Sequence, residues 1–412
     1  MDKEVLKRQL KAPDGQWIAA SEWEVRDIFQ KLTADGEVRL TRPYFWAKGC
    51  GGTFPADVPL GIDEGRVSPG AREVLCRLGM VQNFRQAADD ARRIGNVPVG
   101  RNRLRELVEA EGAAITRARN SGEIRAVWIS ADAKVQDKAT GGVTTRVYAG
   151  VDGVMVPTVT QAEKSKRRKN HGIRRQRRSA AGIGNAKPLP PSRPGADEGF
   201  KEMKIGLFYD QEKKHRHAFV TESNSEAFGL LLKAHGDQVA FEKADESISL
   251  TDGAKWIAGQ ICRVLLLIKV MLLDFYHLSE HIHAAAKCCL GETPEAKEWA
   301  ASRLKDIKEL GVTPVLAAID ALTRNIRAPT KRESLRSLRA YLVARLELLD
   351  YPMALARGID IGSGPTEAAC KTLTLRLKQS GMKWDRDHAA SMMNLTALYD
   401  SGQAQDYWSQ AA

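Results

Sequence analysis

The sequence predicts an α/β fold whose central sheet mixes antiparallel and parallel strands. Three β-rich runs lie between residues 144 and 221, and the short polar turn Gln211–Lys214 joins the last two as in a hairpin. Between 246 and 274, a strand-like run, a helical segment and a second apolar run follow, and each apolar run ends at an aspartate. Short aliphatic and β-branched runs of this kind are typical of strands buried within a sheet.

Composition fits a globular chain with room for two or three domains. The chain has 412 residues, of which 43% are hydrophobic and 28% charged, which is ordinary for a packed protein. Its longest apolar run, Val264–Leu273, is interrupted by Lys269 and is too short to span a membrane. The N-terminus lacks the apolar core of a secretory signal, and the six cysteines form no CxxC pair. We therefore expect a cytoplasmic protein without membrane partners.

The charge is strongly basic and unevenly distributed. Formal net charge is +12, and nine of the fifteen residues from 164 to 178 are Lys or Arg, with no acidic residue among them. Such a block contacts polyanions or stays unfolded, so nucleic acid is the predicted partner. Because this Pro- and Gly-containing stretch cannot bury a core, we expect a flexible basic arm over 161–198. Its predicted DNA contacts are Lys164, Lys166, Arg167, Arg168, Lys169, Arg174, Arg175, Arg177 and Arg178.

The N-terminal region, 1–80, reads as mixed short elements. A helix is predicted to begin after Ser21 and to end near Gly36, followed by a strand over 37–46. Cys50 stands alone in a Gly-rich loop. It is interpreted as a free thiol rather than a metal ligand.

Residues 81–125 have the pattern of a helix-turn-helix. The first helix places Phe84, Ala88, Ala91 and Ile94 on one face; the second turns Leu104, Leu107 and Val108 inward. Three arginines near the start of the second helix, where a recognition helix meets DNA, are candidate DNA contacts: Arg101, Arg103 and Arg105. The alternative is an ordinary helical hairpin with a solvated basic face.

Carboxylates recur at defined places in the core elements. Asp152 lies within the first strand, Asp252 ends the fourth, and Asp274 ends the fifth. Glu367 lies in the first turn of a helix that starts near Ser363. The aspartates could simply be turn residues at strand ends. However, three antiparallel strands followed by alternating helix and strand is the element order of a ribonuclease-H-like sheet, in which the first and fourth strands are neighbours.

Three converging carboxylates suit a pair of divalent ions. Two ions roughly 3.5–4 Å apart activate the attacking oxygen and the leaving oxygen in phosphoryl transfer. Mg²⁺ or Mn²⁺ prefers such oxygen ligands. The positive charge elsewhere in the chain would hold the DNA that an acidic site repels.

These motifs, taken together and in order, resemble a known family. The chain resembles DDE-type transposases of bacterial insertion sequences, specifically the ISKra group, which is related to Mutator-like transposases. The matching segments run from about Arg146 to Trp384, and more loosely over the N-terminal third. They are VDGVMVP around Asp152, FKEMKIGLFYD at 200–210, LTDGAKWI around Asp252, LDFYHLSEH around Asp274, and GSGPTEAACKTLTLRLKQSGMKW around Glu367.

The resemblance implies a catalytic and metal-binding triad of Asp152, Asp252 and Glu367, with two Mg²⁺ or Mn²⁺ ions. It implies that Asp274 and His277 form a supporting element. The implied activity is binding of the element's own terminal repeats, cleavage of the ends and joining of the 3′-hydroxyl to target DNA, by a homodimer or higher oligomer. Members of the family commonly carry paired cysteines near the N-terminus, which suggest a zinc ribbon, whereas this chain has only Cys50 there, so the resemblance implies a degenerate zinc-ribbon-like segment within 1–80.

The resulting domain organisation places a first core part at 143–277, a helical insertion at 278–360, final core helices at 361–400 and a tail at 401–412.

Two other functions compete with the transposase. His277, Glu280 and His281 spell the H-x-x-E-H signature of a zinc metallopeptidase. A non-catalytic DNA-binding protein derived from a transposase would also fit.

Basic residues after Glu367 have two interpretations. Lys371, Arg376 and Lys378 are either phosphate contacts beside the active site or part of a solvated helix face. For Trp384 we expect packing rather than stacking on a base.

Overall fold

The computed structural model describes residues 23–47, 51–54, 67–183 and 194–411. The described chain is mixed α/β, which confirms the predicted fold class at this level. It divides into two compact units, Met1–Ala114 with Ala404–Ala412, and Ile115–Gln403. These units cut the chain differently from the predicted domains, since the end of the chain joins the N-terminal unit. No helix in the described ranges is both long and apolar enough to cross a membrane.

The N-terminal unit begins with a three-stranded antiparallel sheet, β1 (Trp23–Thr33), β2 (Gly36–Ala47) and β3 (Gly51–Thr53). The helix predicted between Ser21 and Gly36 was wrong, because β1 occupies most of that stretch. Thr33 pairs with Gly36, whose φ of 112° favours glycine, so Ala34 and Asp35 form a tight hairpin turn. Gly36, where the helix was expected to end, is the residue that closes this turn. Cys50 and Ser21 lie outside the described residues.

The same unit contains four helices among its described residues. They are α2 (Pro69–Val81), α3 (Phe84–Arg93), most of α4 (Arg101–Ser121) and α15 (Ala404–Ala411). The two helices predicted in 81–125 are therefore present, but Ile94 is 83% exposed and does not belong to the buried face. The predicted C-terminal tail is instead α15, and its Tyr407 hydroxyl donates a hydrogen bond to Glu111 on α4 (2.6 Å).

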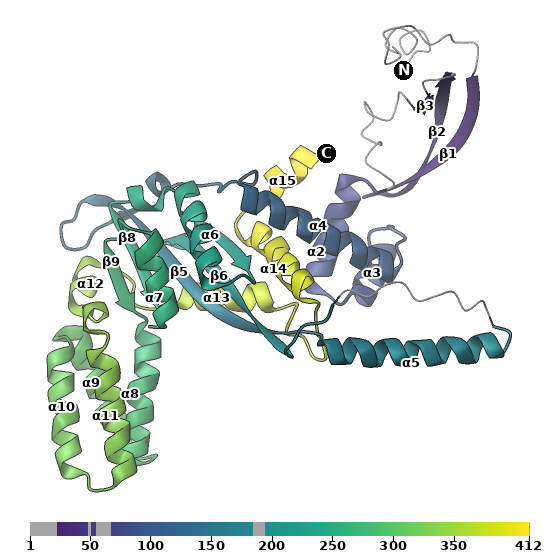
Figure 1. Ribbon diagram of the computed structural model, residues 1–412. Coiled ribbons are helices and arrows are strands. Elements are labelled where there is room, and N and C mark those ends of the chain that lie inside the picture. Colours follow the sequence, from purple (N-terminus) through teal and green to yellow (C-terminus); the bar gives the residue numbers. More distant parts are fainter. Residues whose placement is uncertain (1–22, 48–50, 55–66, 184–193, 412) are drawn as a thin grey trace. The chain divides into compact units, whose positions relative to one another are not determined.

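The second unit is built on one mixed sheet with the strand order β7-β6-β5-β8-β9 (Figure 1). β5 pairs antiparallel with β6, and β6 antiparallel with β7, while β8 pairs parallel with both β5 and β9. The first and fourth strands of this series are neighbours, as the element order predicts. The bounds are β4 (Lys134–Gln136), which pairs with β5, then β5 (Val143–Pro157), β6 (Phe200–Asp210), β7 (Arg216–Thr221), β8 (Glu246–Thr251) and β9 (Val270–Leu273).

Alternation along β5 separates the two faces of the sheet. Val147, Ala149 and Val151 join an apolar cluster with α6 (Ser225–Gln238) and α7 (Lys255–Val264). The even-numbered residues between them face α13 (Gly364–Thr374), which packs on β5. The edge strand β7 is covered by α14 (Arg386–Asp400), because Asn394 exchanges two hydrogen bonds with the backbone of Val220 (3.1 and 3.0 Å).

The helical insertion between β9 and α13 has an apolar cluster of its own. Buried residues include Leu278, Ile307, Ile319, Leu335 and Leu342. As predicted, this part of the chain is helical almost throughout. Its helices are α8 (Phe275–Leu290), α9 (Pro294–Glu309), α10 (Val312–Asn325), α11 (Pro329–Val343) and α12 (Tyr351–Arg357).

The first part of the predicted basic arm is a helix and not a flexible loop. Residues Gln161–Ala180 form the helix α5, in which no side chain is buried. The helix starts at a capping box: Thr160 accepts from the Glu163 backbone N–H (3.2 Å), and the Glu163 side chain accepts from the Thr160 N–H (3.3 Å). Local capping and helix-forming Lys, Arg, Gln and Ala therefore suffice for a helix here, without a core.

Candidate active site

Two adjacent parallel strands bring Asp152 and Asp252 to the same end of the sheet. Five consecutive pairs join β5 and β8, the last being Gly150 with Leu250. Asp152 and Asp252 each follow this last pair by two residues, and they lie close enough for the charge of Asp252 to act on Asp152. This arrangement is the one predicted for these carboxylates.

Asp152 is half-buried and sits among other carboxylates. Its Oδ1 accepts from the backbone N–H of Gly153 (2.7 Å), and its Oδ2 accepts from the thiol of Cys370 (3.2 Å). Burial raises the pKa of Asp152 above its ordinary value, and the charges of Asp252 and Glu202 raise it further, although the two hydrogen bonds oppose the shift. A positive charge at this point would relieve the repulsion.

Asp252 lies in a tight turn directly after β8. Its Oδ1 accepts from the backbone N–H of Ala254 (2.8 Å), while Gly253 adopts a φ of 82°. This Asx-type bond orients the carboxylate at the strand end. The turn therefore presents Asp252 beside Asp152 with one carboxylate oxygen occupied by the backbone.

Glu367 lies on α13, which packs against β5 at Gly150. A Cβ at Gly150 would lie 1.9 Å from Oγ1 of Thr366, so only glycine in β5 lets α13 approach this closely. Glu367 follows Thr366 in the first turn of α13 and is exposed. Burial and the charge of Asp152 raise the pKa of the Cys370 thiol, and the charge of Glu367 raises this pKa further, so Glu367 lies near Cys370. The predicted helix start is confirmed, with Ser363 at the N-cap and Pro365 in the first turn.

The described carboxylates do not form a complete metal site by themselves. Among the described residues, no group of three His, Cys, Asp or Glu side chains is arranged so that it could hold a metal ion. The donor set nevertheless fits divalent cations chemically, because such ions prefer carboxylate oxygens, and burial together with the charge of Asp252 raises the pKa of Asp152. Asp152, Asp252 and Glu367 are the residues that would hold them.

Asp274, predicted to support the site, bonds the elements on either side of it. It caps α8, accepting from the His277 backbone N–H (2.9 Å), and its other oxygen accepts from the N–H of Ser363 (2.7 Å). Only 3% of Asp274 is exposed. The side chain thus connects the end of β9 to the start of the helix that carries Glu367.

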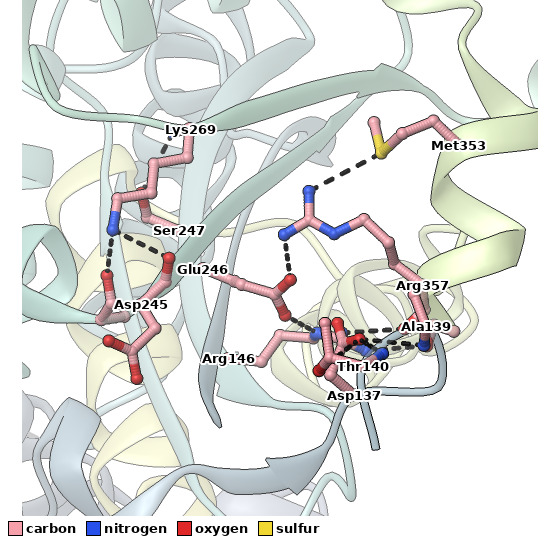
Figure 2. Close-up of polar contacts among 12 residues, drawn as sticks. Asp137, Ala139, Thr140, Arg146, Asp245, Glu246, Ser247, Lys269, Met353 and Arg357 are labelled. Carbon is pink, nitrogen blue, oxygen red and sulfur yellow. Dashed lines mark hydrogen bonds and ion pairs between the residues drawn. The ribbon is translucent and has the colours of Figure 1, made fainter. Parts of the chain in front are cut away.

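An ion-pair network at the start of β5 and the start of β8 holds the beginning of the loop that precedes α13 (Figure 2). Arg146, 1% exposed, pairs with Glu246 and donates to the carbonyls of Gly358 (2.8 Å) and Arg357 (3.0 Å). Arg357 pairs with the other Glu246 oxygen. Together with Asp274, this network fixes both ends of the loop that leads into α13.

The H-x-x-E-H histidines are engaged with aromatic neighbours. His281 stacks on Tyr341 with ring centroids 4.0 Å apart, and the His277 ring meets it edge-on at 5.1 Å. Burial lowers the pKa of His281, and the positive charge of Arg345 adds to this effect. Glu280 approaches only His277 (3.8 Å). Both rings are therefore part of the packing between α8 and α11.

The predicted DNA contacts are distributed over both units. Those in α5 are exposed apart from the half-buried Lys164 and Arg175, and Lys164 pairs with Asp385 (2.6 Å). Arg101, Arg103 and Arg105 are exposed at the start of α4 in the N-terminal unit. Lys371 and Lys378 are exposed as well.

Arg376 does not fit its predicted role as a phosphate contact. It is only 3% exposed, and its guanidinium lies over the ring of Trp384 at 5.0 Å. Burial lowers the pKa of Arg376 to about 10. Trp384 is 5% exposed and packs, as expected.

Three contributors to the site escaped sequence reasoning. Cys370 stands three residues after Glu367, and this helical spacing could have indicated a shared face. Glu202 lies on β6 near Asp152 and pairs with Lys204 (3.0 Å). Arg345 comes from the helical insertion and contacts the Asp252 turn, with no local signal in the sequence.

No family model matches this chain, and no curated protein matches it closely enough to count as a relative.

Proposed function

We propose that this protein is a DNA transposase with a ribonuclease-H-like core that cleaves and joins DNA through Asp152, Asp252 and Glu367. One observation carries the proposal. Asp152 and Asp252 each follow, by two residues, the last pair of the parallel strands β5 and β8, and the close contact of Thr366 with Gly150 brings the helix of Glu367 onto β5. The strand order β7-β6-β5-β8-β9, with its three antiparallel strands at one side, supports the ribonuclease-H-like assignment.

The three carboxylates would hold two Mg²⁺ or Mn²⁺ ions. When bound, such ions activate an attacking oxygen and stabilise the leaving oxygen of a phosphodiester. The protein's own part is to hold the ligands in place: Gly153 and Cys370 fix Asp152, Ala254 fixes Asp252, and Asp274 anchors the start of α13. Water and then a DNA 3′-hydroxyl would be the two successive nucleophiles.

Double-stranded DNA is the partner that the basic surfaces fit. The exposed lysines and arginines of α5 would follow phosphates, and the start of α4, in a helix-turn-helix-type arrangement, would contact the terminal repeats. Synapsis of two element ends requires at least a homodimer on DNA.

The proposal is tested with the full-length chain, Mn²⁺ or Mg²⁺, and DNA carrying the element's ends. Asp152→Asn, Asp252→Asn and Glu367→Gln should each lower end cleavage and strand transfer by at least about a thousandfold, because each removes a ligand charge needed in the transition state. Asp320→Asn, an exposed carboxylate paired with Arg339, is the matched control and should act as wild type. Strand transfer retained by any of the three site variants would overturn the assignment of that residue.

A second candidate is a non-catalytic DNA-binding protein derived from such an enzyme. It is favoured by the lack, within the described ranges, of a ready three-ligand group. Specific binding of element ends without cleavage, equal for wild type and Asp152→Asn, would establish this second function.

A further inference from the structure

Arg345 connects the helical insertion to the turn that carries Asp252. It lies just after α11, and its Nη2 donates to the carbonyl oxygen of Gly253 (2.9 Å). Its Nη1 donates to the carbonyl oxygen of Tyr341, one helical turn earlier (3.2 Å). The two bonds fix the guanidinium between the end of a helix and the backbone next to Asp252.

Packing at Gly253 shows how closely this guanidinium fits. A Cβ added at Gly253 would lie 2.4 Å from Nε of Arg345 and 2.9 Å from Cδ1 of Leu273. The φ of 82° at the same residue also favours glycine. The turn is therefore shaped to receive the arginine.

An aromatic stack holds Arg345 from the other side. Its guanidinium lies over the Tyr341 ring at 4.0 Å, and Tyr341 stacks on His281, also at 4.0 Å. Burial raises the pKa of Tyr341 to about 12, and the positive charge of Arg345 opposes this shift. The charges of Asp252 and Asp274 add to the shift, so both carboxylates lie within electrostatic range of the Tyr341 ring. The histidines of the H-x-x-E-H sequence thus form the base of a stack that ends beside Asp252.

We propose that Arg345 is a positioning residue for Asp252, through which the helical insertion holds the Asp252–Gly253 turn in the geometry needed for cation binding. A planar guanidinium that is stacked and doubly hydrogen-bonded is far more constrained than a lysine would be. Loss of this anchor would free the turn and let the Asp252 carboxylate move away from Asp152. The cation-binding part of this inference rests on the proposed function, whereas the anchoring of the turn does not.

Amide hydrogen exchange of the full-length protein tests the anchoring directly. In Arg345→Ala, amides of the segment 252–255 should exchange about tenfold faster than in wild type, the change expected for loss of one charged hydrogen bond. Arg345→Lys should be intermediate, because an ammonium can still donate to the Gly253 carbonyl. Arg339→Ala removes an exposed arginine of α11, the helix before Arg345, that pairs with Asp320, and it should leave the segment unchanged.

Titration with Mn²⁺ alone, followed by calorimetry, provides the second readout. Under conditions in which both proteins are fully folded, Arg345→Ala should bind Mn²⁺ about tenfold more weakly than wild type, as for other residues that orient a metal ligand. Wild-type exchange at 252–255 in a folded Arg345→Ala would overturn the inference, as would unchanged Mn²⁺ affinity. Should the alanine variant not fold, the exchange rate of Arg345→Lys decides in the same way. Faster exchange in a protein whose wild type binds no Mn²⁺ would instead sink the proposed function and leave the anchoring in place.

Discussion

At the scale of single residues, the most informative contact of the site is the thiol of Cys370 on Asp152. The two atoms lie 3.2 Å apart, although their residues are 218 positions apart in the chain. Burial and the Asp152 charge raise the pKa of the Cys370 thiol well above its ordinary value, so it stays protonated and can donate. The thiol therefore sets the orientation of one carboxylate oxygen and ties α13 to β5.

Substitution of Cys370 separates this hydrogen bond from mere packing. Cys370→Ala removes the donor and should weaken Mn²⁺ binding and slow strand transfer by about tenfold, because Asp152 loses a fixed orientation. Cys370→Ser keeps a donor of similar size and should restore at least part of both. Calorimetric Mn²⁺ affinity, measured beside urea stability, checks the prediction; equal losses in the alanine and serine variants would show that only packing is involved.

At the scale of elements, α5 is a helix that contacts the rest of its unit near its start, where Lys164 pairs with Asp385. None of its side chains is buried, and its basic residues occupy every side of it. These charges extend for about 30 Å along the helix axis, at 1.5 Å per residue. This exposed charge is the basis of the proposed contact with DNA phosphates.

Neutralising part of α5 should reduce the salt dependence of DNA binding. Changing Arg174, Arg175, Arg177 and Arg178 to Gln should weaken binding and lower the slope of log K against log salt by up to about 3.6, at about 0.9 per lost phosphate contact. Arg324, Arg327, Arg332 and Arg336 are exposed in the helical insertion, and their replacement by Gln changes net charge equally. Identical slopes in the two variants would mean that α5 contributes only to the overall charge.

At the scale of the whole molecule, the sheet unit depends on buried groups that must stay neutral. His217 on β7 and His235 on α6 share a hydrogen bond of 2.8 Å and are both almost fully buried. Burial lowers the pKa of both, that of His235 to about 3, and the nearby positive charge of Arg119 adds to the effect. Protonation of either ring therefore opposes folding.

Stability should consequently fall as the pH drops below about 6.5, the ordinary pKa of histidine. Between that pH and the lowered pKa of the folded state, only the unfolded chain binds the proton. The free energy of unfolding should thus decrease by up to about 1.4 kcal/mol per pH unit for each histidine. Urea unfolding at about pH 7 and about pH 5 measures this loss. His235→Gln should shrink the difference between the two pH values, whereas His283→Gln, at an exposed histidine, should leave it as in wild type.

Sequence alone determined those features that depend on neighbours along the chain or on element order. Strand alternation and the order of strands and helices were sufficient to predict that Asp152 and Asp252 would be adjacent, because parallel pairing of the first and fourth strands follows from that order. The start of the Glu367 helix was readable from Ser363 and Pro365. Asp274 was predicted to support the site, and its capping bonds to α8 and α13 fit that role.

Tertiary structure decided the rest, because those features depend on partners that local patterns do not specify. Residues 23–33 form a strand rather than the expected helix because they pair with β2, a partner that the cap at Ser21 and the glycine at 36 did not indicate. Arg376 proved to be packed over Trp384, and Arg345 reaches Gly253 across 92 positions. A contact between distant residues arises only when the sheet and the helical insertion are assembled, so the residues that orient the carboxylates became visible only in the folded chain.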